Sequence, residues 1–299
     1  MTKSYPHTRS NLVQKKSLGQ NFLVNEKVYQ FMVQEIAPQK GEVIIEVGPG
    51  EGVLTEHLAK SEARIIAVEK DHRLIPSLKE KFKDQKNVTI TEEDILKFDP
   101  KKLRFDLFAD PRSNLGIFNY KLVGNIPYYL TSHLLRITLE DWPKPKSILF
   151  MVQKEVAQRM TAKPPRMNLL ALSVQFFAKA KIVKKISRGN FRPTPKVDSA
   201  LVKIIPKEKF AFDKLFQKNF FQLAQAAFQN KRKQILNSLT NNLTYRAALF
   251  VQGSPVSFKD FLNQKMAGAG IEPTRRPESL SVEEWERITK AFWPEQLSA

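Results

Sequence analysis

The sequence LVGNIPYYLTS (122–132) places an amide, a proline and two tyrosines where an apolar strand is expected to end. The side-chain oxygen of Asn125 and the backbone carbonyl of Ile126 are two hydrogen-bond acceptors, and Pro127 aims the carbonyl by confining Ile126 to an extended conformation. Acceptors on both N–H groups of an exocyclic adenine amine favour the tetrahedral nitrogen that can act as a nucleophile. The ring of Tyr128 offers a surface on which an extruded base can stack.

The chemistry that this stretch favours is attack of the amine on an electrophilic methyl group held in line with it. Such catalysis works by positioning and by fixed dipoles, and it needs no general base if the proton leaves after the nitrogen has become cationic. A bare N-x-P-Y sequence also fits an ordinary turn. Its place after the fourth of a series of apolar strands favours the catalytic interpretation, with Asn125, Ile126, Pro127 and Tyr128 as catalytic residues.

A second group of residues is typical of a nucleotide site. In EVGPGEG (46–52), Gly48 and Gly50 let the backbone turn sharply and approach a ligand closely. Glu69 ends the next strand, where a carboxylate can accept from both hydroxyls of a ribose. Asp94 follows the third strand, where its side chain can accept from an adenine amine. Both acids could instead cap helices. The set predicts an adenosine-containing cofactor, for which NAD and S-adenosylmethionine both remain open until the methyl-transfer motif is considered.

Strands and helices alternate around these residues, which predicts a parallel sheet covered on both faces, with ligands at the carboxyl ends of its strands. Strands are expected at 42–47, 63–71, 87–94, 120–125 and 146–153, with helices at 25–38, 53–61 and 71–82. Two further strands, 180–187 and 199–206, are predicted to form a hairpin that closes the sheet. After Pro206 only helical patterns follow, at 212–239, 256–270 and 281–293. We therefore expect a methyltransferase-type domain over 1–207 and an all-helical domain over 208–299.

The chain has 49 basic and 30 acidic residues and a net charge of +19, which suggests a polyanionic partner. Between residues 156 and 197 there are ten basic residues and no acidic one. Cysteine is absent, which excludes disulfides and thiolate chemistry. We find no apolar run long enough for a membrane span, no secretory signal and no metal-binding motif. The expectation is a cytoplasmic enzyme that works on nucleic acid.

Taken together, the motifs resemble the ribosomal RNA adenine dimethyltransferase family over nearly the whole chain. The similar segments are SLGQNFL (17–23), EVGPGEGVLT, AVEKD, EED, GNIPYYLTS, MVQKEVAQRM and FRPTPKVDSALVKI. The later segments AAFQNKRKQILNSL and AGIEPTRRPESLSVEEW resemble the bacterial small-subunit branch. That resemblance implies a Rossmann-like, S-adenosylmethionine-dependent methyltransferase sheet with a C-terminal helical domain. It also implies dimethylation of two adjacent adenosines in the 3′-terminal hairpin of 16S rRNA during ribosome biogenesis.

The resemblance also assigns roles to individual residues. Those implied to contact the cofactor are Asn21, Leu23, Gly48, Gly50, Glu69, Asp94 and Asn125, with Gln20 helping to close the pocket. Phe191 would pack on the face of the target adenine opposite Tyr128, although it could also be a core aromatic under a long loop. The nearby Arg188, Arg192 and Lys196 suit phosphate contacts. One departure is that PRMNLLALSVQFF (165–177) lacks a glycine usual in the family, which concerns RNA contacts near Arg166.

Three alternatives remain at this point. The nearest is a macrolide-resistance type methyltransferase that acts on large-subunit rRNA and shares the fold and motifs. A second is a non-catalytic RNA-binding assembly factor, against which the intact Asn125, Tyr128, Glu69 and Asp94 argue. A DNA adenine methyltransferase is a remote third. The segment NKRKQ (230–234) fits an RNA contact and a solvated helix face equally well. The expected partner is the small ribosomal subunit, and we expect the enzyme to be a monomer.

Overall fold

A computed structural model describes residues 21–103, 119–127, 129–208, 212–230, 232–242 and 257–293. Its strands are β1 (Phe22–Leu23), β2 (Val43–Val47), β3 (Arg64–Glu69), β4 (Val88–Glu92), β5 (Tyr120–Asn125), β6 (Ser147–Gln153), β7 (Ala178–Ile186), β8 (Phe191–Arg192) and β9 (Ser199–Pro206). Its helices are α1 (Glu26–Ile36), α2 (Val53–Ala59), α3 (Ile75–Lys81), α4 (Thr131–Glu140), α5 (Lys154–Met160), α6 (Leu169–Phe177), α7 (Lys214–Phe228), α8 (Ile235–Thr240), α10 (Phe258–Gly268) and α11 (Val282–Phe292). Short 3₁₀ turns lie at Pro100–Lys102, Arg188–Asn190 and Pro277–Ser279.

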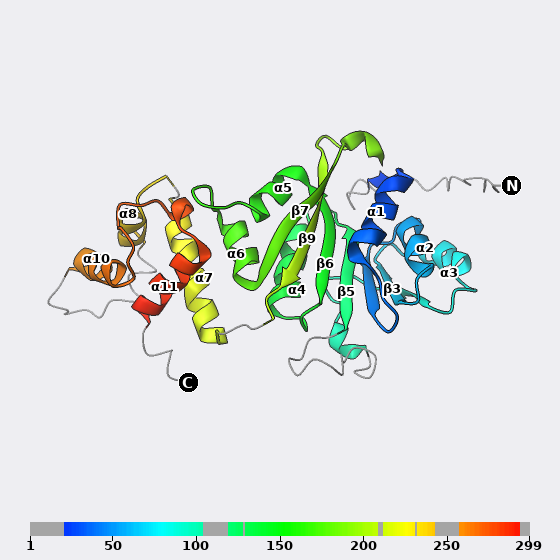
Figure 1. Ribbon diagram of the computed structural model, residues 1–299, viewed down its shortest axis with the longest axis horizontal. Coiled ribbons are helices and arrows are strands. Elements are labelled where there is room, and N and C mark those ends of the chain that lie inside the picture. Colours follow the sequence, from blue (N-terminus) through cyan, green and yellow to red (C-terminus); the bar gives the residue numbers. More distant parts are fainter. Residues whose placement is uncertain are drawn as a thin grey trace.

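Seven strands form one sheet in the order β4-β3-β2-β5-β6-β9-β7. The five strands from β4 to β6 are parallel, and β9 runs antiparallel between β6 and β7. The expected parallel sheet and its closing hairpin are therefore confirmed. Since β6 and β7 are both antiparallel to β9, β7 runs in the same direction as β6. The six strands other than β9 therefore have their carboxyl ends at the same edge of the sheet (Figure 1).

Alternate residues of the central strands face two different hydrophobic layers. On one face Ile44 packs with α1 and α2, through residues such as Met32 and Leu58. On the other face Ile45 belongs to the cluster that includes Leu134 of α4. Both faces are covered, so all five residues of β2 are buried. This explains why the strand reads as an unbroken apolar run around a single glutamate.

The C-terminal helices do not form a separate core. Residues of α7, α8, α10 and α11 belong to the same hydrophobic cluster as one face of the sheet. An aromatic seam makes the connection: the Phe176 ring of α6 stacks on Phe220 of α7 with centroids 4.1 Å apart, and Phe212 stacks on Phe216 at 4.2 Å. Figure 1 shows these helices at one end of an elongated molecule and the sheet at the other. The boundary at 207/208 stays a prediction.

One helical segment differs from its prediction. The helical pattern over 212–239 is divided into α7 and α8 by a turn in which Lys233 N–H donates to the Asn230 carbonyl. α8 then begins where Ile235 N–H donates to the Arg275 carbonyl, 2.8 Å away. The Ile235 N–H therefore bonds to a distant carbonyl and not to the carbonyl four residues earlier, as it would in a continuous helix. Periodicity could not show this, because it reports apolar spacing and not a partner forty residues away.

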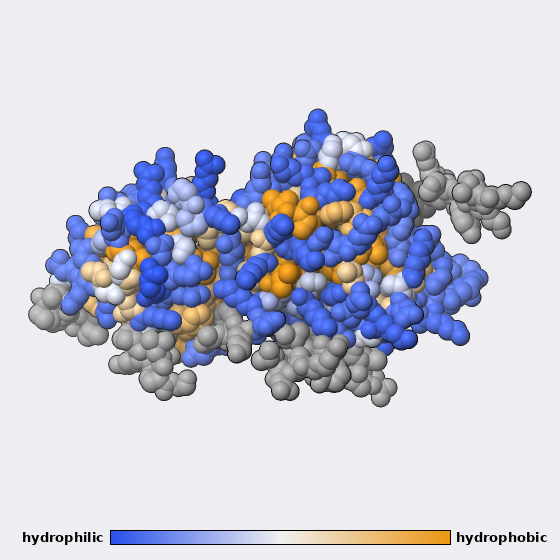
Figure 2. All heavy atoms as spheres, viewed as in Figure 1, coloured by the Kyte–Doolittle hydropathy of each residue, from blue (hydrophilic) through white to orange (hydrophobic). Residues whose placement is uncertain are grey.

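The molecular surface is largely hydrophilic on the face drawn in Figure 2. Hydrophobic residues reach that surface near the middle of the view, where Figure 1 places β7 and β9. Ile205 of β9 is one of the exposed aliphatic residues, at 48 %. None of the described helices is long and apolar enough to cross a membrane.

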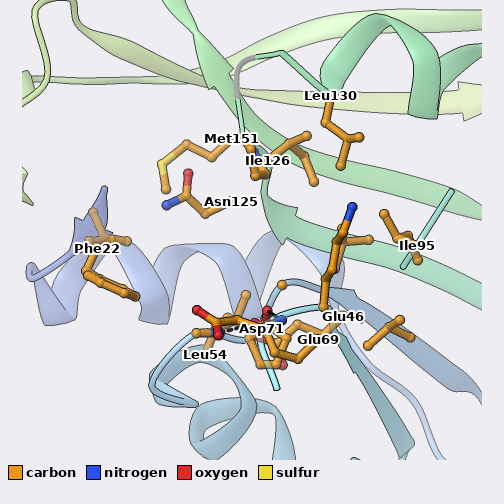
Figure 3. A pocket seen from close by; sticks show the side chains of 18 of the residues that line it. Phe22, Glu46, Leu54, Glu69, Asp71, Ile95, Asn125, Ile126, Leu130 and Met151 are labelled. Carbon is orange, nitrogen blue, oxygen red and sulfur yellow. Dashed lines mark hydrogen bonds between the residues drawn. The ribbon is translucent and has the colours of Figure 1, made fainter. Parts of the chain in front are cut away.

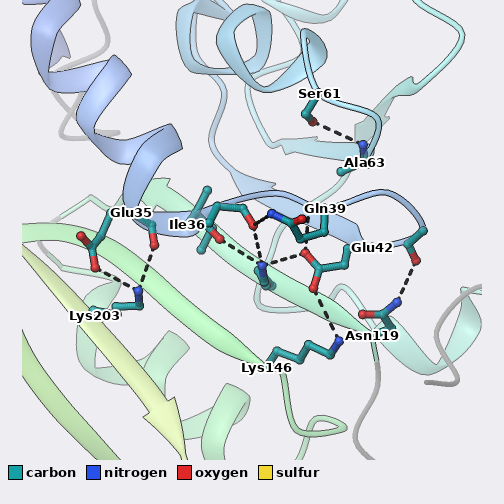
Figure 4. Close-up of polar contacts among 12 residues, drawn as sticks. Glu35, Ile36, Gln39, Glu42, Ser61, Ala63, Asn119, Lys146 and Lys203 are labelled. Atoms are coloured by element: carbon teal, nitrogen blue, oxygen red, sulfur yellow. Dashed lines mark hydrogen bonds and ion pairs between the residues drawn. The ribbon is translucent and has the colours of Figure 1, made fainter. Parts of the chain in front are cut away.

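A buried charge network holds the edge of the sheet opposite to the carboxyl ends (Figure 4). The Glu42 carboxylate lies 2.7 Å from Lys121 Nζ and 3.5 Å from Lys146 Nζ, and it accepts from Gln39 N–H. Lys121 Nζ also donates to the carbonyl oxygens at the end of α1. Glu42 is 6 % exposed, so its charge depends on these partners.

Glu42→Ala is expected to lower the free energy of unfolding by roughly 3 kcal/mol, because it leaves the partly buried Lys121 ammonium without its carboxylate. Chemical denaturation monitored by circular dichroism measures the change. Lys40→Ala is the matched control, because the Lys40–Glu62 pair is exposed and should contribute less than about 1 kcal/mol. Equal losses in the two variants would contradict the role given to Glu42.

Candidate active site

A pocket opens at the carboxyl edge of β2, β3 and β5 (Figure 3). Nine of the predicted site residues line it: Asn21, Leu23, Gly48, Gly50, Glu69, Asp94, Asn125, Ile126 and Pro127. Gln20 and Tyr128 lie outside the described residues. The methyl-transfer motif and the nucleotide motif, which are about 75 residues apart in sequence, therefore share one pocket.

Glycine is required at two places, one in the wall of this pocket and one just before Asn125. Gly50 has φ +60°, a left-handed backbone conformation that residues with a Cβ rarely adopt, and a Cβ there would lie 3.1 Å from the Phe22 ring. Gly124 of β5 lies opposite Val47 of β2, and a Cβ on it would lie 2.6 Å from the Val47 carbonyl oxygen. Gly124 therefore lets β5 approach β2 closely just before the strand ends at Asn125.

The Glu69 carboxylate joins the glycine loop to the end of β3. One oxygen accepts from Gly50 N–H at 3.1 Å and the other from Asp71 N–H at 2.8 Å. Burial raises the pKa of Glu69, while these backbone hydrogen bonds favour the charged form. Each carboxylate oxygen has a second lone pair, so both can still accept from ribose hydroxyls.

Asp94 is held by a lysine that the sequence analysis did not single out. Lys70 Nζ lies 2.6 Å from one Asp94 oxygen, and Leu96 N–H donates to the other. Burial works against the Asp94 charge, but the hydrogen bonds from Lys70 and Leu96 outweigh it and hold the pKa of this carboxyl below its usual range. Asp94 is therefore a fixed hydrogen-bond acceptor, as recognition of an adenine amine requires. Its sequence signal was the segment AVEKD, in which Lys70 directly follows Glu69.

Asn125 is oriented by the N-terminal segment. Its Nδ2 donates to the backbone carbonyl of Asn21 at 3.0 Å, which commits the NH₂ group and leaves the side-chain oxygen as the acceptor in the pocket wall. Ile126 N–H donates to the Met151 carbonyl of β6, so the backbone that carries the second acceptor is anchored as well. No hydrogen bond to the Ile126 carbonyl is formed within the described part of the chain. The pair of acceptors is thus preorganised.

Phe191 lies close to the pocket but does not line it. β8 pairs with β1 so that Phe191 is opposite Leu23, and the Phe191 side chain is 1 % exposed in the cluster with Met32 and Leu201. Its ring is therefore part of the core in this conformation, which agrees with the alternative that the sequence left open. Stacking of Phe191 on a target base stays a prediction.

Sequence reasoning missed several residues that shape the pocket. Tyr29 of α1 lines it and donates from its hydroxyl to the Leu23 carbonyl at 2.7 Å. Met151 and Leu130 add apolar surface, and Figure 3 shows them above Asn125 and beside Ile126. Their types carry no chemical signature, because aromatic and aliphatic residues at these spacings are ordinary core residues.

Glu46 is a buried carboxyl at the base of the pocket. It is 1 % exposed, and Thr55 Oγ1 donates to it at 2.7 Å. Burial raises the pKa of Glu46 to about 8, with the Thr55 hydrogen bond opposing and the Glu69 charge adding to the rise. At neutral pH this group is therefore largely protonated. It places little negative charge beside Glu69.

Raising the pH should reduce the stability that Glu46 contributes. The folded protein binds this proton more tightly than the unfolded chain, so stability falls as the pH rises from about 4.5 to about 8. The Glu46→Gln variant cannot titrate. Its stability relative to the natural protein should grow by at most about 1.4 kcal/mol per pH unit in this window. Denaturant midpoints at pH 5, 6.5 and 8 measure this, and parallel profiles would show that Glu46 titrates normally.

Comparison with known proteins agrees with this geometry. A family model described as ribosomal RNA adenine dimethylase matches residues 11–268. The chain belongs to this family. Its cofactor is accordingly S-adenosylmethionine, whose adenosine moiety suits the glycine loop, Glu69 and Asp94. The matched range covers the pocket, the closing hairpin and helices α7, α8 and α10.

Individual relatives support the assignment. The chain is 41 % identical over 275 residues to the ribosomal RNA small subunit methyltransferase A of Dehalococcoides mccartyi, which covers 92 % of this chain and 87 % of that protein. Its fold is similar to a dimethyladenosine transferase from Plasmodium falciparum (TM-score 0.73, 23 % identity, 89 % and 95 % of the two chains). It is also similar to the 23S rRNA methyltransferase ErmE (TM-score 0.67, 24 % identity, 91 % and 99 %). The two structures show the Rossmann-like fold with its helical C-terminal part.

Proposed function

We propose that this enzyme transfers methyl groups from S-adenosylmethionine to the exocyclic amines of two adjacent adenosines in the 3′-terminal hairpin of 16S rRNA. Membership of the adenine dimethylase family supports the reaction, and the name of the Dehalococcoides relative supports the small subunit as the target. The single observation that carries the chemistry is the hydrogen bond from Asn125 Nδ2 to the Asn21 carbonyl, because it fixes the amide oxygen as an acceptor in the pocket.

In this proposal the chain contributes positioning and fixed dipoles. S-adenosylmethionine supplies an electrophilic methyl group on its sulfonium when bound. The Asn125 side-chain oxygen and the Ile126 carbonyl accept from the two N–H groups of the adenine, which turns the nitrogen lone pair away from the ring. Tyr128 supports the base by stacking. The proton leaves the cationic nitrogen after methyl transfer, so no base residue is needed.

The cofactor is held by residues at the ends of two strands. Glu69 is placed to accept from the ribose hydroxyls and Asp94 from the adenine amine, while the Gly48–Gly50 turn gives the backbone close approach. We also propose that the protein acts in the cytoplasm as a monomer on ribosomal particles. The net charge of +19 supports a polyanionic partner of this size.

Asn125→Ala is expected to lower kcat for methyl transfer at least about 100-fold, because one of two preorganised acceptors is lost. Asn125→Asp should fail as well, since a carboxylate cannot donate to the Asn21 carbonyl and would be repelled by it. Incorporation of labelled methyl groups into unmethylated small subunits measures both effects. Asn237→Ala, at an exposed asparagine of α8, is the matched control and should keep full activity. Normal turnover by Asn125→Ala would exclude the mechanism.

The choice of RNA is tested with the natural protein. Purified small and large ribosomal subunits, both lacking adenine dimethylation, are incubated with labelled S-adenosylmethionine, and the methylated nucleotides are mapped. We expect label at two adjacent adenosines near the 3′ end of the small-subunit rRNA. Label confined to large-subunit rRNA would identify the macrolide-resistance type instead. RNA binding with no label in either subunit would identify a non-catalytic assembly factor.

A further inference from the structure

The edge strand β7 carries lysines that are not paired. Lys179, Lys181 and Lys185 are exposed, and within the described part of the chain none of them forms an ion pair. Many other lysines of the sheet region do have a carboxylate within 4 Å: Lys40, Lys70, Lys81, Lys83, Lys121, Lys146, Lys154 and Lys203. Within the described residues, the three ammonium groups of β7 therefore have no carboxylate partner, as is also true of exposed lysines near β4 such as Lys79 and Lys86.

The neighbours of β7 do not supply the missing negative charge. The segment from 156 to 197, which includes β7, contains no acidic residue. Across the strand pair, Lys181 lies opposite Lys203, whose ammonium is already bound to Glu35 at 2.9 Å. Asp198 is engaged too, because it accepts from Arg188 N–H and lies 3.8 Å from Lys154 Nζ. Lys179 and Lys181 lie on the same face of the sheet as Lys203, whereas Lys185, beyond the register shift in β7, lies on the face of Ala200. Positive charge is therefore present on both faces of this edge strand, where it attracts anions.

The direction of β7 brings the end of the strand that carries Lys185 to the edge of the sheet at which the pocket opens. β7 runs parallel to β6, so its carboxyl end lies at the edge where the pocket opens. The chain continues through the 3₁₀ turn Arg188–Asn190 into β8, which pairs with β1. Phe22 and Leu23 of β1 line the pocket. Nine residues of strand span about 30 Å, which is long enough to contact several phosphates of one RNA helix.

We propose that Lys179, Lys181 and Lys185 form a phosphate-binding track along the free edge of the sheet, on which the stem of the RNA substrate lies while its loop enters the pocket. This track, defined by those three residues, rests on the proposed function. The partner is the sugar–phosphate backbone of a base-paired RNA, because ammonium groups on one strand bind phosphates without reading bases. A lysine-rich edge can also serve only to prevent edge-to-edge strand pairing, and the experiment separates these roles.

The test compares three variants of the full chain. The track variant changes Lys179→Gln, Lys181→Gln and Lys185→Gln together. A second variant replaces the same residues with Arg and keeps the charge. The matched control changes Lys79→Gln, Lys83→Gln and Lys86→Gln, which are exposed lysines of α3 and of the turn before β4, at the opposite edge of the sheet. The two glutamine variants each remove three positive charges, and the arginine variant removes none. Circular dichroism verifies that all three variants fold.

The measurement is the affinity for unmethylated small subunits, and for a hairpin of their 3′-terminal rRNA, at 50 to 250 mM salt. For the track variant, the plot of log K against log salt should become less steep by about 2–3 units of slope. Its affinity near 150 mM salt should be at least about tenfold lower than that of the natural protein. The arginine variant and the control should keep the slope of the natural protein. The affinity for S-adenosylmethionine should be unchanged in all three, because the track does not line the pocket.

The outcomes distinguish a phosphate-binding track from a lysine-rich edge that only prevents strand pairing. If the track variant and the opposite-edge control have equal slopes, the track is excluded. Light scattering that reveals aggregation of the track variant, while its monomer binds RNA with full affinity, would assign the lysines to edge protection and overturn the proposal. If the natural protein methylates the small subunit and the track variant binds it normally, only this inference fails. If the natural protein neither binds nor methylates the small subunit, the proposed function fails with it.

Discussion

The Glu69 carboxylate is the interaction on which the rest of the site depends. It accepts from Gly50 N–H with one oxygen and from Asp71 N–H with the other, and so it ties the glycine loop after β2 to the end of β3. Parallel strands bring their carboxyl ends to one edge, but they do not fix the loops that follow. The buried carboxylate does this, because an unpaired charge at 7 % exposure would be costly. The two oxygens that we propose bind the ribose are thus the ones that fix the loop geometry.

The sheet and the C-terminal helices share one hydrophobic cluster, joined by the stacked rings of Phe176 and Phe220. The helical part is therefore packed as a continuation of the sheet and not as a module on a free linker. This packing explains why the change from strands to helices after Pro206 is sharp in sequence while the core is continuous in space.

Sequence patterns were sufficient for the elements with strong periodicity. The strands at 43–47 and 64–69 were found because burial on both faces leaves an unbroken apolar run. Asn125, Glu69 and Asp94 were found because polar residues that directly follow such runs must lie at one edge. The pairing of Lys70 with Asp94 and the insertion of β9 beside β6 could not be predicted, and for Phe191 the sequence could not decide between a core position and a base-stacking position. All three depend on long-range contacts, and two-residue strands such as β1 and β8 leave no periodic signal.

The pairing of β1 with β8 has a mechanical consequence. Val24 N–H donates to the Asn190 carbonyl, and Asn25 Nδ2 donates to Asn190 Oδ1, so the short ribbon is clamped at its end. The segment that orients Asn125 and the loop that carries Phe191 are therefore tied to each other, although they are about 165 residues apart in sequence. A substitution that weakens the short ribbon is expected to disturb both the packing of the Phe191 ring and the orientation of the Asn125 amide.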